Sequence, residues 1–168
     1  MLPVLLVASA AACGSPANGS SNQSREAELG TGLGADRSTW TRHHGVGDPI
    51  LTGVSFAGDR VDGFTMHLGG GLTEAAARTA AVKAIPTDAR LVFERRKYIG
   101  TTDSDDQCDL LQYQSAELGR VIPNDPAGVI IIQLGRLTDN GLEAYDPDHV
   151  TTISILATGT LNDVPGEC

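Results

Sequence analysis

The chain has 168 residues, a formal net charge of −9 and a hydrophobic fraction of 40%. A length of this order predicts one domain, and the apolar content is sufficient for a single core. An acidic surface with few aromatic residues repels phosphate backbones, so we do not expect nucleic acid to be a partner.

An uncharged apolar run opens the sequence: residues 2–12 read LPVLLVASAAA and end in small side chains. The run is too short to cross a hydrocarbon core of about 30 Å as a helix, but it suits the apolar region of a signal peptide. Because no Lys or Arg precedes it, we expect translation to start a few codons upstream. An ordinary secretory signal and a buried N-terminal strand are the alternatives.

Ala10, Ala11 and Ala12 lie immediately before Cys13. This sequence resembles the lipobox of bacterial lipoproteins, although the commonest lipobox has Leu at the position of Ala10. The resemblance implies cleavage before Cys13, transfer of diacylglyceryl to Cys13, and retention on the extracytoplasmic face of the cell membrane. Two acyl chains make such anchoring effectively permanent, whereas one chain binds only marginally. The composition as a whole is similar to that of actinobacterial envelope lipoproteins.

A segment rich in Gly, Ser and Asn follows over residues 14–34, with Leu29 and Leu33 as its only sizeable apolar residues. Such a segment buries too little surface to offset its conformational entropy, so it predicts a flexible tether. The expected organisation is a cleaved signal peptide over residues 1–12, the lipidated cysteine and a flexible linker over 13–37, and a folded domain over 38–168.

The two remaining cysteines, Cys108 and Cys168, are expected to form a disulfide, because leftover cysteines outside the cytoplasm most often pair. A bridge that closes a loop of this size contributes about 4 kcal/mol in the chain-entropy model. Two free thiols and a metal site are the alternatives. The sequence lacks the paired-cysteine spacing that is typical of zinc sites.

The first elements of the domain read as a hairpin. Apolar residues alternate with polar ones over residues 54–56 and 64–68, and the Gly58-Asp59 pair between them is typical of a tight turn. The three glycines at 69–71 are expected to break the sheet and to lead through a positive-φ turn into a helix.

Residues 73–85 predict the clearest helix of the chain. Thr73 caps its first turn, Glu74 pairs with Arg78 one turn later, and Pro86 ends it. Its small-residue face, which allows a helix to lie close to a sheet, consists of Ala77, Ala80, Ala81, Ala84 and Ile85.

A strand is expected over residues 90–99, with Leu91, Val92 and Phe93 inside and a charged end. The alternating pattern of residues 111–115 predicts the next strand.

Ser115 is then expected to cap a short helix that ends at Val121. The nearly continuous β-branched run 129–134 predicts a central strand, and residues 150–157 alternate as the last one. Asn140-Gly141 between them is a hairpin signal. Strands joined mainly by short turns predict an α+β fold: a single domain with a mainly antiparallel sheet and one main helix packed on one face.

Acidic side chains crowd the sequence around Cys108, at Asp103, Asp105, Asp106 and Asp109. Calcium prefers several oxygen ligands, so Asp103, Asp105 and Asp109 are the candidate metal ligands. The EF-hand spacing is absent, and a solvated acidic loop is the favoured interpretation.

A second polar cluster comprises Asp139, Asp146, Asp148 and His149. The Asp-Pro-Asp sequence within it is typical of a turn before a strand, so a metal or acid–base role is the less favoured interpretation.

His43, His44 and His67 are expected at surface or boundary positions, because neighbouring residues of a strand point to opposite faces. Trp40 is expected to pack the first turn of the domain. The only basic run, at residues 95–97, is expected to protect an exposed strand, with an anionic partner as the alternative.

Neither a Gly-x-Ser-x-Gly nor a Ser-x-x-Lys nucleophile motif occurs in the sequence. We therefore expect a non-catalytic binding or scaffolding module without a cofactor. It would present its sheet face or an edge strand to an envelope protein, a peptide or a small ligand, and contact the membrane through its N-terminal lipid. The alternative is an extracytoplasmic hydrolase or metal-dependent enzyme that uses the acidic loops.

Overall fold

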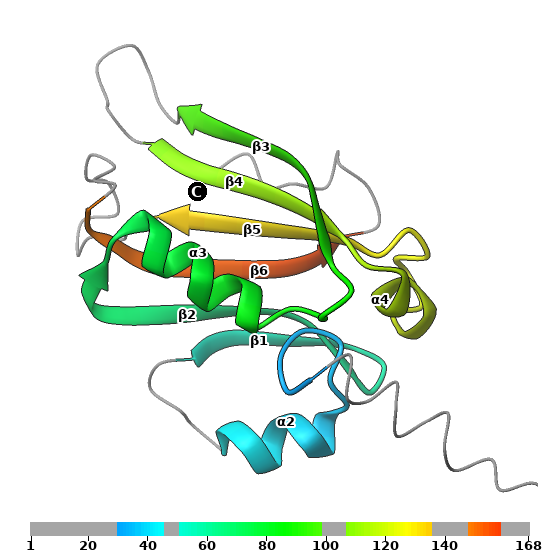
Figure 1. Cartoon of the computed structure of the whole chain (residues 1–168). Coiled ribbons are helices and arrows are strands. Elements are labelled where there is room, and N and C mark those ends of the chain that lie inside the picture. Colours follow the sequence, from blue (N-terminus) through cyan, green and yellow to red (C-terminus); the bar gives the residue numbers. More distant parts are fainter. Residues whose placement is uncertain (1–29, 46–50, 99–106, 136–147, 159–168) are drawn as a thin grey trace, which may run out of the picture.

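The computed structural model describes residues 30–45, 51–98, 107–135 and 148–158. Within them, one open six-stranded sheet has the order β1-β2-β6-β5-β4-β3, and all neighbouring strands are antiparallel (Figure 1). The strands are β1 (Leu51–Ala57), β2 (Arg60–Leu72), β3 (Arg90–Tyr98), β4 (Gln107–Gln114), β5 (Val129–Gly135) and β6 (Val150–Thr158). The described helices are α2 (Arg37–His44), α3 (Glu74–Lys83) and α4 (Ala116–Val121).

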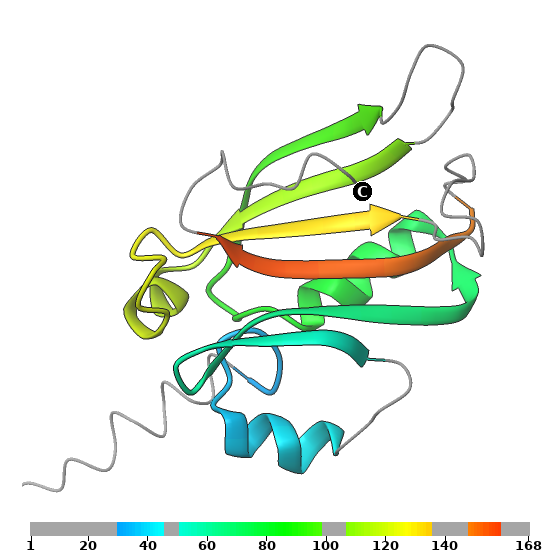
Figure 2. The ribbon, with the colours of Figure 1, turned by 180° about the vertical axis from the view of Figure 1, so that it is seen from behind.

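The mainly antiparallel α+β domain expected from the sequence is confirmed at this level, and so is the order of elements from β1 to β6. β6 is the last strand along the chain, yet it lies between β2 and β5, as the view from behind also shows (Figure 2). β5 has the central position predicted for it, and residues 129–134 are all buried. β1 and β3 form the two edges of the sheet.

The β1–β2 hairpin turns at Gly58-Asp59 as predicted, and Gly58 has a φ of 65°. The expected break of the strand at residues 69–71 is wrong, because β2 continues to Leu72. The irregularity lies instead in the pairing with β6, whose register jumps between His67 and Leu72. Two of the three glycines have positive φ values, a conformation that side chains disfavour.

Most buried side chains belong to one large core cluster. Its fully buried members on the two central strands are Ile130, Ile132, Leu134, Val150, Ile153 and Ile155. A smaller second cluster consists of Leu110, Val129 and Ile131. Because successive side chains of a strand point to opposite faces, the two clusters lie on opposite faces of the sheet.

α3 begins where the sequence predicts. Thr73 is its N-cap, and the Thr73 hydroxyl oxygen accepts the backbone N–H of Ala76 at 3.3 Å. Ala77 and Ala81, from the predicted small-residue face, are fully buried in the large core cluster. Their small side chains suit a helix whose backbone lies close to its neighbours.

α2 is a helix that the sequence reasoning missed. Its N-cap is Asp36, whose carboxylate accepts the backbone N–H of Thr39 at 2.9 Å. The hydrogen bond from Ser38 lowers the pKa of Asp36 most, burial opposes this effect, and the bonds from Thr39 lower the pKa further. Trp40 on this helix is 5% exposed, with its ring centroid 4.9 Å from that of Phe64. Trp40 is therefore part of the core.

The predicted linker over residues 13–37 is wrong at its C-terminal end, where the structure describes residues 30–37. Leu33 and Ala35 are fully buried. The backbone there is also paired: Leu33 N–H donates to the Ala84 carbonyl at 2.9 Å, and Val61 N–H donates to the Ala35 carbonyl at 3.0 Å. The segment is ordered here because the rest of the domain buries the Leu33 side chain and provides hydrogen-bond partners for the backbone.

β3 also corrects the sequence analysis. Leu91, Val92 and Phe93 were expected inside, but they are 46%, 51% and 49% exposed. The reason is the place of the strand in the sheet: β3 is outermost, and among the described strands it pairs only with β4. The register passes from Leu91–Tyr113 to Phe93–Gln112, so Val92 occupies a bulge without a partner on β4.

Candidate functional site

Several residues singled out in the sequence lie outside the described residues. They are Cys13, Asp103, Asp105, Asp106, Asp139, Asn140, Gly141, Asp146 and Cys168. Cys108 is on β4, opposite Lys97, and its side chain is also outside the description. The lipid attachment and the disulfide therefore stay predictions. Among the described helices, none is long and apolar enough to cross a membrane.

Asp109 is the one candidate metal ligand that the structure describes. It lies on β4, its side chain is 4% exposed, and its Oδ2 is 3.3 Å from Nη2 of Arg78 on α3. Asp109 is thus a buried partner of an arginine rather than part of a solvated loop. No group of three or more His, Cys, Asp or Glu residues within the described ranges is arranged to hold a metal ion.

Arg78 joins three carboxylates from three elements. Besides Asp109, its Nε lies 2.9 Å from Glu74 Oε1, and its Nη1 lies 2.8 Å from Glu94 Oε2 on β3. Burial acts to lower the pKa of Arg78, but the hydrogen bond to Glu94 and the charges of Glu74 and Glu94 outweigh it and raise the pKa. Arg78 therefore remains charged and fastens α3 to β3 and β4.

Tyr113 lies beside this cluster, on β4. Burial raises the pKa of its hydroxyl, the positive charge of Arg78 opposes that shift, and the negative charge of Glu94 adds to it. A phenol whose ionised form is disfavoured in this way remains protonated at neutral pH.

The histidines lie at surface or boundary positions, as the sequence predicts, but His43 and His44 are on helix α2 and not on a strand. His44 on α2 has its Nε2 3.0 Å from the Thr31 carbonyl and its ring centroid 4.2 Å from that of Trp40. His67 on β2 has its Nε2 2.7 Å from Oγ1 of Thr52 on β1. These contacts are structural ones between neighbouring elements.

The described part of the second polar cluster is Asp148 and His149, just before β6. Asp148 is exposed. The ring of His149 packs on Gly71, where a Cβ atom would lie only 2.7 Å from Nδ1 of the imidazole. His43 contacts its neighbour His44 edge-on, with ring centroids 4.7 Å apart. None of these side chains lines the cavity described next.

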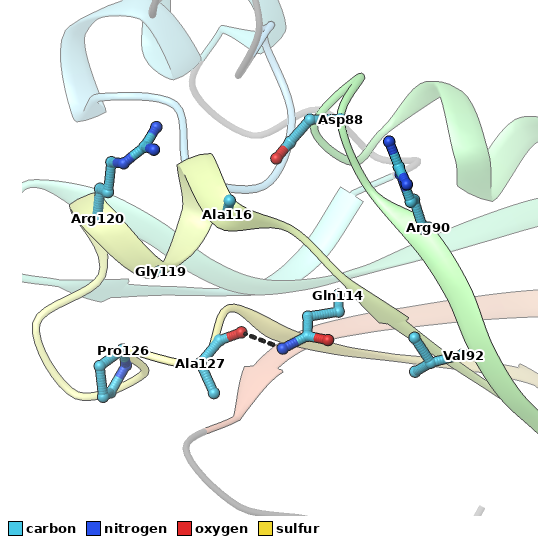
Figure 3. Close-up of a pocket in the computed structure, with 9 residues that line it drawn as sticks. All are labelled: Asp88, Arg90, Val92, Gln114, Ala116, Gly119, Arg120, Pro126 and Ala127. Atoms are coloured by element: carbon cyan, nitrogen blue, oxygen red, sulfur yellow. Dashed lines mark hydrogen bonds between the residues drawn. The ribbon is translucent and has the colours of Figure 1, made fainter.

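A cavity of about 640 Å³ opens at the end of the sheet where β3 begins (Figure 3). Its lining comes from the turn before β3, β3 itself, the end of β4, α4 and the loop that follows α4. The charged residues of this lining are Asp88, Arg90 and Arg120. Its volume lies within the range of natural small-ligand sites, roughly 300–1,000 Å³.

Asp88, in the turn before β3, is hydrogen-bonded to the start of α4 on another wall of the cavity. Its Oδ1 accepts a hydrogen bond from the Ser115 hydroxyl at 2.6 Å, and its Oδ2 accepts one from the backbone N–H of Glu117 at 3.1 Å. Ser115 is the N-cap of α4, as predicted, and its Oγ also accepts the N–H of Leu118 at 3.0 Å. The turn before β3 and the start of α4 are therefore held together.

Close backbone packing fixes the wall formed by α4 and the loop after it. A Cβ atom on Gly119 would lie 2.6 Å from the Pro126 carbonyl oxygen, and one on Gly128 would lie 1.8 Å from the Ser115 carbonyl oxygen. The side-chain amide of Gln114 donates to the Ala127 carbonyl at 3.1 Å (Figure 3). The cavity is therefore built from segments with little freedom to separate.

The two arginines of the cavity differ in their partners. Arg120 forms an ion pair with Glu117 on the same helix. Arg90 is exposed and makes no ion pair with any other residue that the structure describes. Arg90 is thus the cation of the lining that is available to a ligand.

Val92 joins this cavity to an exposed apolar strand. Leu91, Val92 and Phe93, which we call the apolar edge, are each about half exposed, and Val92 also lines the cavity. Three adjacent exposed apolar residues on an edge strand are unusual for a soluble surface. The apolar edge and the cavity form one continuous candidate binding surface.

Comparisons of the chain with protein-family models, with curated proteins and with solved structures find no match. What the protein binds is therefore inferred from its own residues.

Proposed function

We propose that the protein is a non-catalytic binding module of the cell envelope, anchored through a lipid on Cys13 at the extracytoplasmic face of the membrane. It binds an extended segment of a partner protein along the outer edge of β3. The observation that carries this proposal is the apolar edge, which is half exposed on a strand that pairs on one side only among the described strands.

The backbone of an edge strand favours such a ligand. It presents N–H and C=O groups without strand partners, and an extended peptide satisfies them by adding one more strand. Natural edges are commonly protected by charge, and β3 has basic residues in its second half. The apolar edge lies in the first half of β3, where side chains of the partner would pack on apolar surface.

The charge of β3 indicates the composition of the partner. Four of the 12 Lys and Arg residues of this acidic chain are on β3, one before the apolar edge and three after it. A segment with apolar side chains in its middle and acidic ones toward its ends is complementary to this pattern. Such charge complementarity contributes mainly to specificity and to the rate of association.

We further propose that α3 is the main helix packed on one face of the sheet, so that partner binding is left to the edge. The burial of Ala77 and Ala81 in the large core cluster supports this placement, as do the ion pairs of Arg78 with Glu94 and Asp109 (Figures 1 and 2). The disulfide between Cys108 and Cys168 belongs to the same proposal, in which the oxidising setting outside the cytoplasm maintains it.

The proposal is tested with random peptides displayed on phage and selected on the full chain. The domain offers a matched pair of variants, Val92→Lys on β3 and Val82→Lys on α3, since the two valines are 51% and 48% exposed. Selected peptides should bind the wild type and Val82→Lys equally, and Val92→Lys about tenfold more weakly, as expected for an interface residue.

Equal affinity of the selected peptides for both variants would exclude the β3 edge as their site. A selection that enriches no peptide would also count against the proposal. Circular dichroism of both variants ensures that weaker binding is not a loss of fold.

A further inference from the structure

We infer that the cavity beside β3 binds a single carboxylate of the partner segment, with Arg90 as the residue that recognises it. This inference rests on the proposed function, because it names the chemical group of the ligand that enters the cavity next to the apolar edge. Arg90 lies on β3 immediately before Leu91, so a strand paired with β3 passes this arginine.

Among the charged residues of the lining, Arg90 is the one whose side chain has no hydrogen-bond or ion-pair partner among the described residues. Asp88 accepts hydrogen bonds from Ser115 and from the backbone of Glu117, and Arg120 forms an ion pair with the Glu117 side chain. The planar guanidinium of arginine forms two parallel N–H···O hydrogen bonds to a carboxylate, which makes the contact both strong and directional. A lysine at this position would provide charge without that geometry.

The charges of the lining favour a monoanion. Its charged residues are Arg90, Arg120 and Asp88, and the charge of Arg120 is balanced by its ion pair with Glu117, so Arg90 is the one cation of the lining without an ion-pair partner among the described residues. One carboxylate matches this single positive charge. A phosphate dianion would bring a second negative charge close to Asp88, and the like charges would repel each other.

The rest of the lining and the size of the cavity indicate what is attached to the carboxylate. Val92, Pro126 and Ala127 provide apolar wall, and about 640 Å³ is far more than a carboxylate alone fills. The cavity therefore accommodates the carboxylate together with the small apolar part of the residue that bears it. Two sources fit: the C-terminal carboxylate of a partner, or an Asp or Glu side chain within its segment.

The test uses three small probes, each titrated into the ¹⁵N-labelled full chain at constant pH and ionic strength. N-acetylvaline carries an α-carboxylate, N-acetylglutamic acid α-amide carries a side-chain carboxylate, and N-acetylvalinamide is the neutral control. The Nε–H resonance of Arg90, assigned by its loss in Arg90→Gln, reports binding. Arg42, exposed on α2, is the reference arginine.

We expect the Arg90 resonance to shift and saturate with a carboxylate probe and to stay in place with N-acetylvalinamide. Saturation by N-acetylvaline alone identifies a C-terminal ligand, and saturation by the glutamate probe alone identifies an internal acidic residue. Backbone shifts around the cavity should need about tenfold more probe in Arg90→Gln, and an intermediate amount in Arg90→Lys, as expected when a bidentate contact is lost.

The inference is overturned if neither carboxylate gives a saturable shift, if the neutral amide gives the same one, or if the Arg42 resonance follows that of Arg90. Its failure is distinguishable from failure of the proposed function. Phage-selected peptides that bind the apolar edge with an affinity unchanged by Arg90→Gln would remove the carboxylate site and leave strand binding in place. Carboxylate binding at Arg90 without any peptide at the edge would do the reverse.

Discussion

The hydroxyl of Ser115 donates to Asp88 across 2.6 Å while the same oxygen accepts the N–H of Leu118, so one side chain caps α4 and holds the turn before β3. Ser115 is fully buried. Without this oxygen, Asp88 would lose one hydrogen-bond donor, and the N–H of Leu118 in the first turn of α4 would lose its acceptor. The shape of the candidate cavity thus depends on this residue.

Ser115→Ala should therefore lower the free energy of unfolding by about 2 kcal/mol, the upper range for loss of an N-cap, because a second bond is lost with it. Urea denaturation measures this change. Thr41→Ala on α2 removes a hydroxyl from an exposed helix position and serves as the control, with an expected change below about 0.5 kcal/mol. A similar small change in Ser115→Ala would show that the two bonds contribute little.

Replacement of Arg78 by methionine should cost about 3 kcal/mol, because the buried carboxylate of Asp109 would lose a charged partner. The control is Arg37→Met, whose pair with Asp59 at 3.7 Å is exposed on both sides and should contribute less than about 1 kcal/mol. Unfolding in urea at neutral pH compares the two. If both variants lose the same small amount, Arg78 does not fasten α3 to the sheet.

The double variant Arg78→Met, Asp109→Asn tests the same cause in another way. If the loss comes from the buried carboxylate of Asp109 losing this cation, replacing that carboxylate by an amide should restore about half of it. Strictly additive losses would place the effect of Arg78 elsewhere.

Asp125 should make stability depend on pH in the opposite direction from an ordinary paired carboxylate. It is 1% exposed, and its carboxylate oxygens have no hydrogen bond of normal geometry among the described residues. Burial raises its pKa, while the backbone N–H groups of Val129 and Gly128 lower it in part. The folded state thus favours the protonated form.

Because the folded pKa of Asp125 is above the unfolded one, its favourable contribution is present below the ordinary Asp pKa of about 3.9 and is lost as the pH rises through the folded pKa. Asp125→Asn should therefore raise the melting temperature at pH 7, by an amount that corresponds to about 1 kcal/mol, and have little effect near pH 3. Thermal unfolding against pH measures this. Asp59→Asn, whose side chain is 75% exposed, is the control. A melting temperature that falls at pH 7 would mean that the carboxylate is a stabilising cap.

Lipid attachment has its own test. Growth with an alkyne fatty acid, followed by fluorophore coupling, should label the native chain and leave Cys13→Ala unlabelled. The label should be found in the membrane fraction, as expected for two-chain anchoring. Equal labelling of both proteins, or of neither, would contradict the lipid anchor on Cys13.

Local patterns predicted much of the fold. The caps at Thr73 and Ser115 and the pair of Glu74 with Arg78 all involve residues at most four positions apart. Contacts of this range are decided within one helical turn, so the sequence alone determines them. Arg78 also shows the limit of prediction from local sequence, since its contact with Asp109 depends on how α3 and β4 pack together in the folded domain.

The wrong predictions concern residues whose burial or exposure is determined by segments that are distant in the sequence. Leu91, Val92 and Phe93 have the pattern of an inner strand, but β3 is an edge because, among the described strands, it pairs with β4 alone. No residue near position 92 indicates that the strand lies at the edge of the sheet. Leu33 is the opposite case, an apolar residue of a glycine-rich segment that is nevertheless fully buried in the core of the domain.

The cavity was not predicted for the same reason. Its walls come from five segments that are brought together only by the sheet and by the bond between Asp88 and Ser115. Arg90 reads in the sequence as an ordinary charged strand end, and only the structure reveals that it faces a cavity without an ion-pair partner among the described residues.

Amide hydrogen exchange of the full chain, with and without a phage-selected peptide, examines the binding edge itself. If the peptide adds a strand to β3, the amides of β3 should exchange about tenfold more slowly in its presence, and those of β1, the opposite edge of the sheet, should be unchanged. Protection confined to β1 or to α3, or unchanged exchange in β3, would contradict strand addition at this edge.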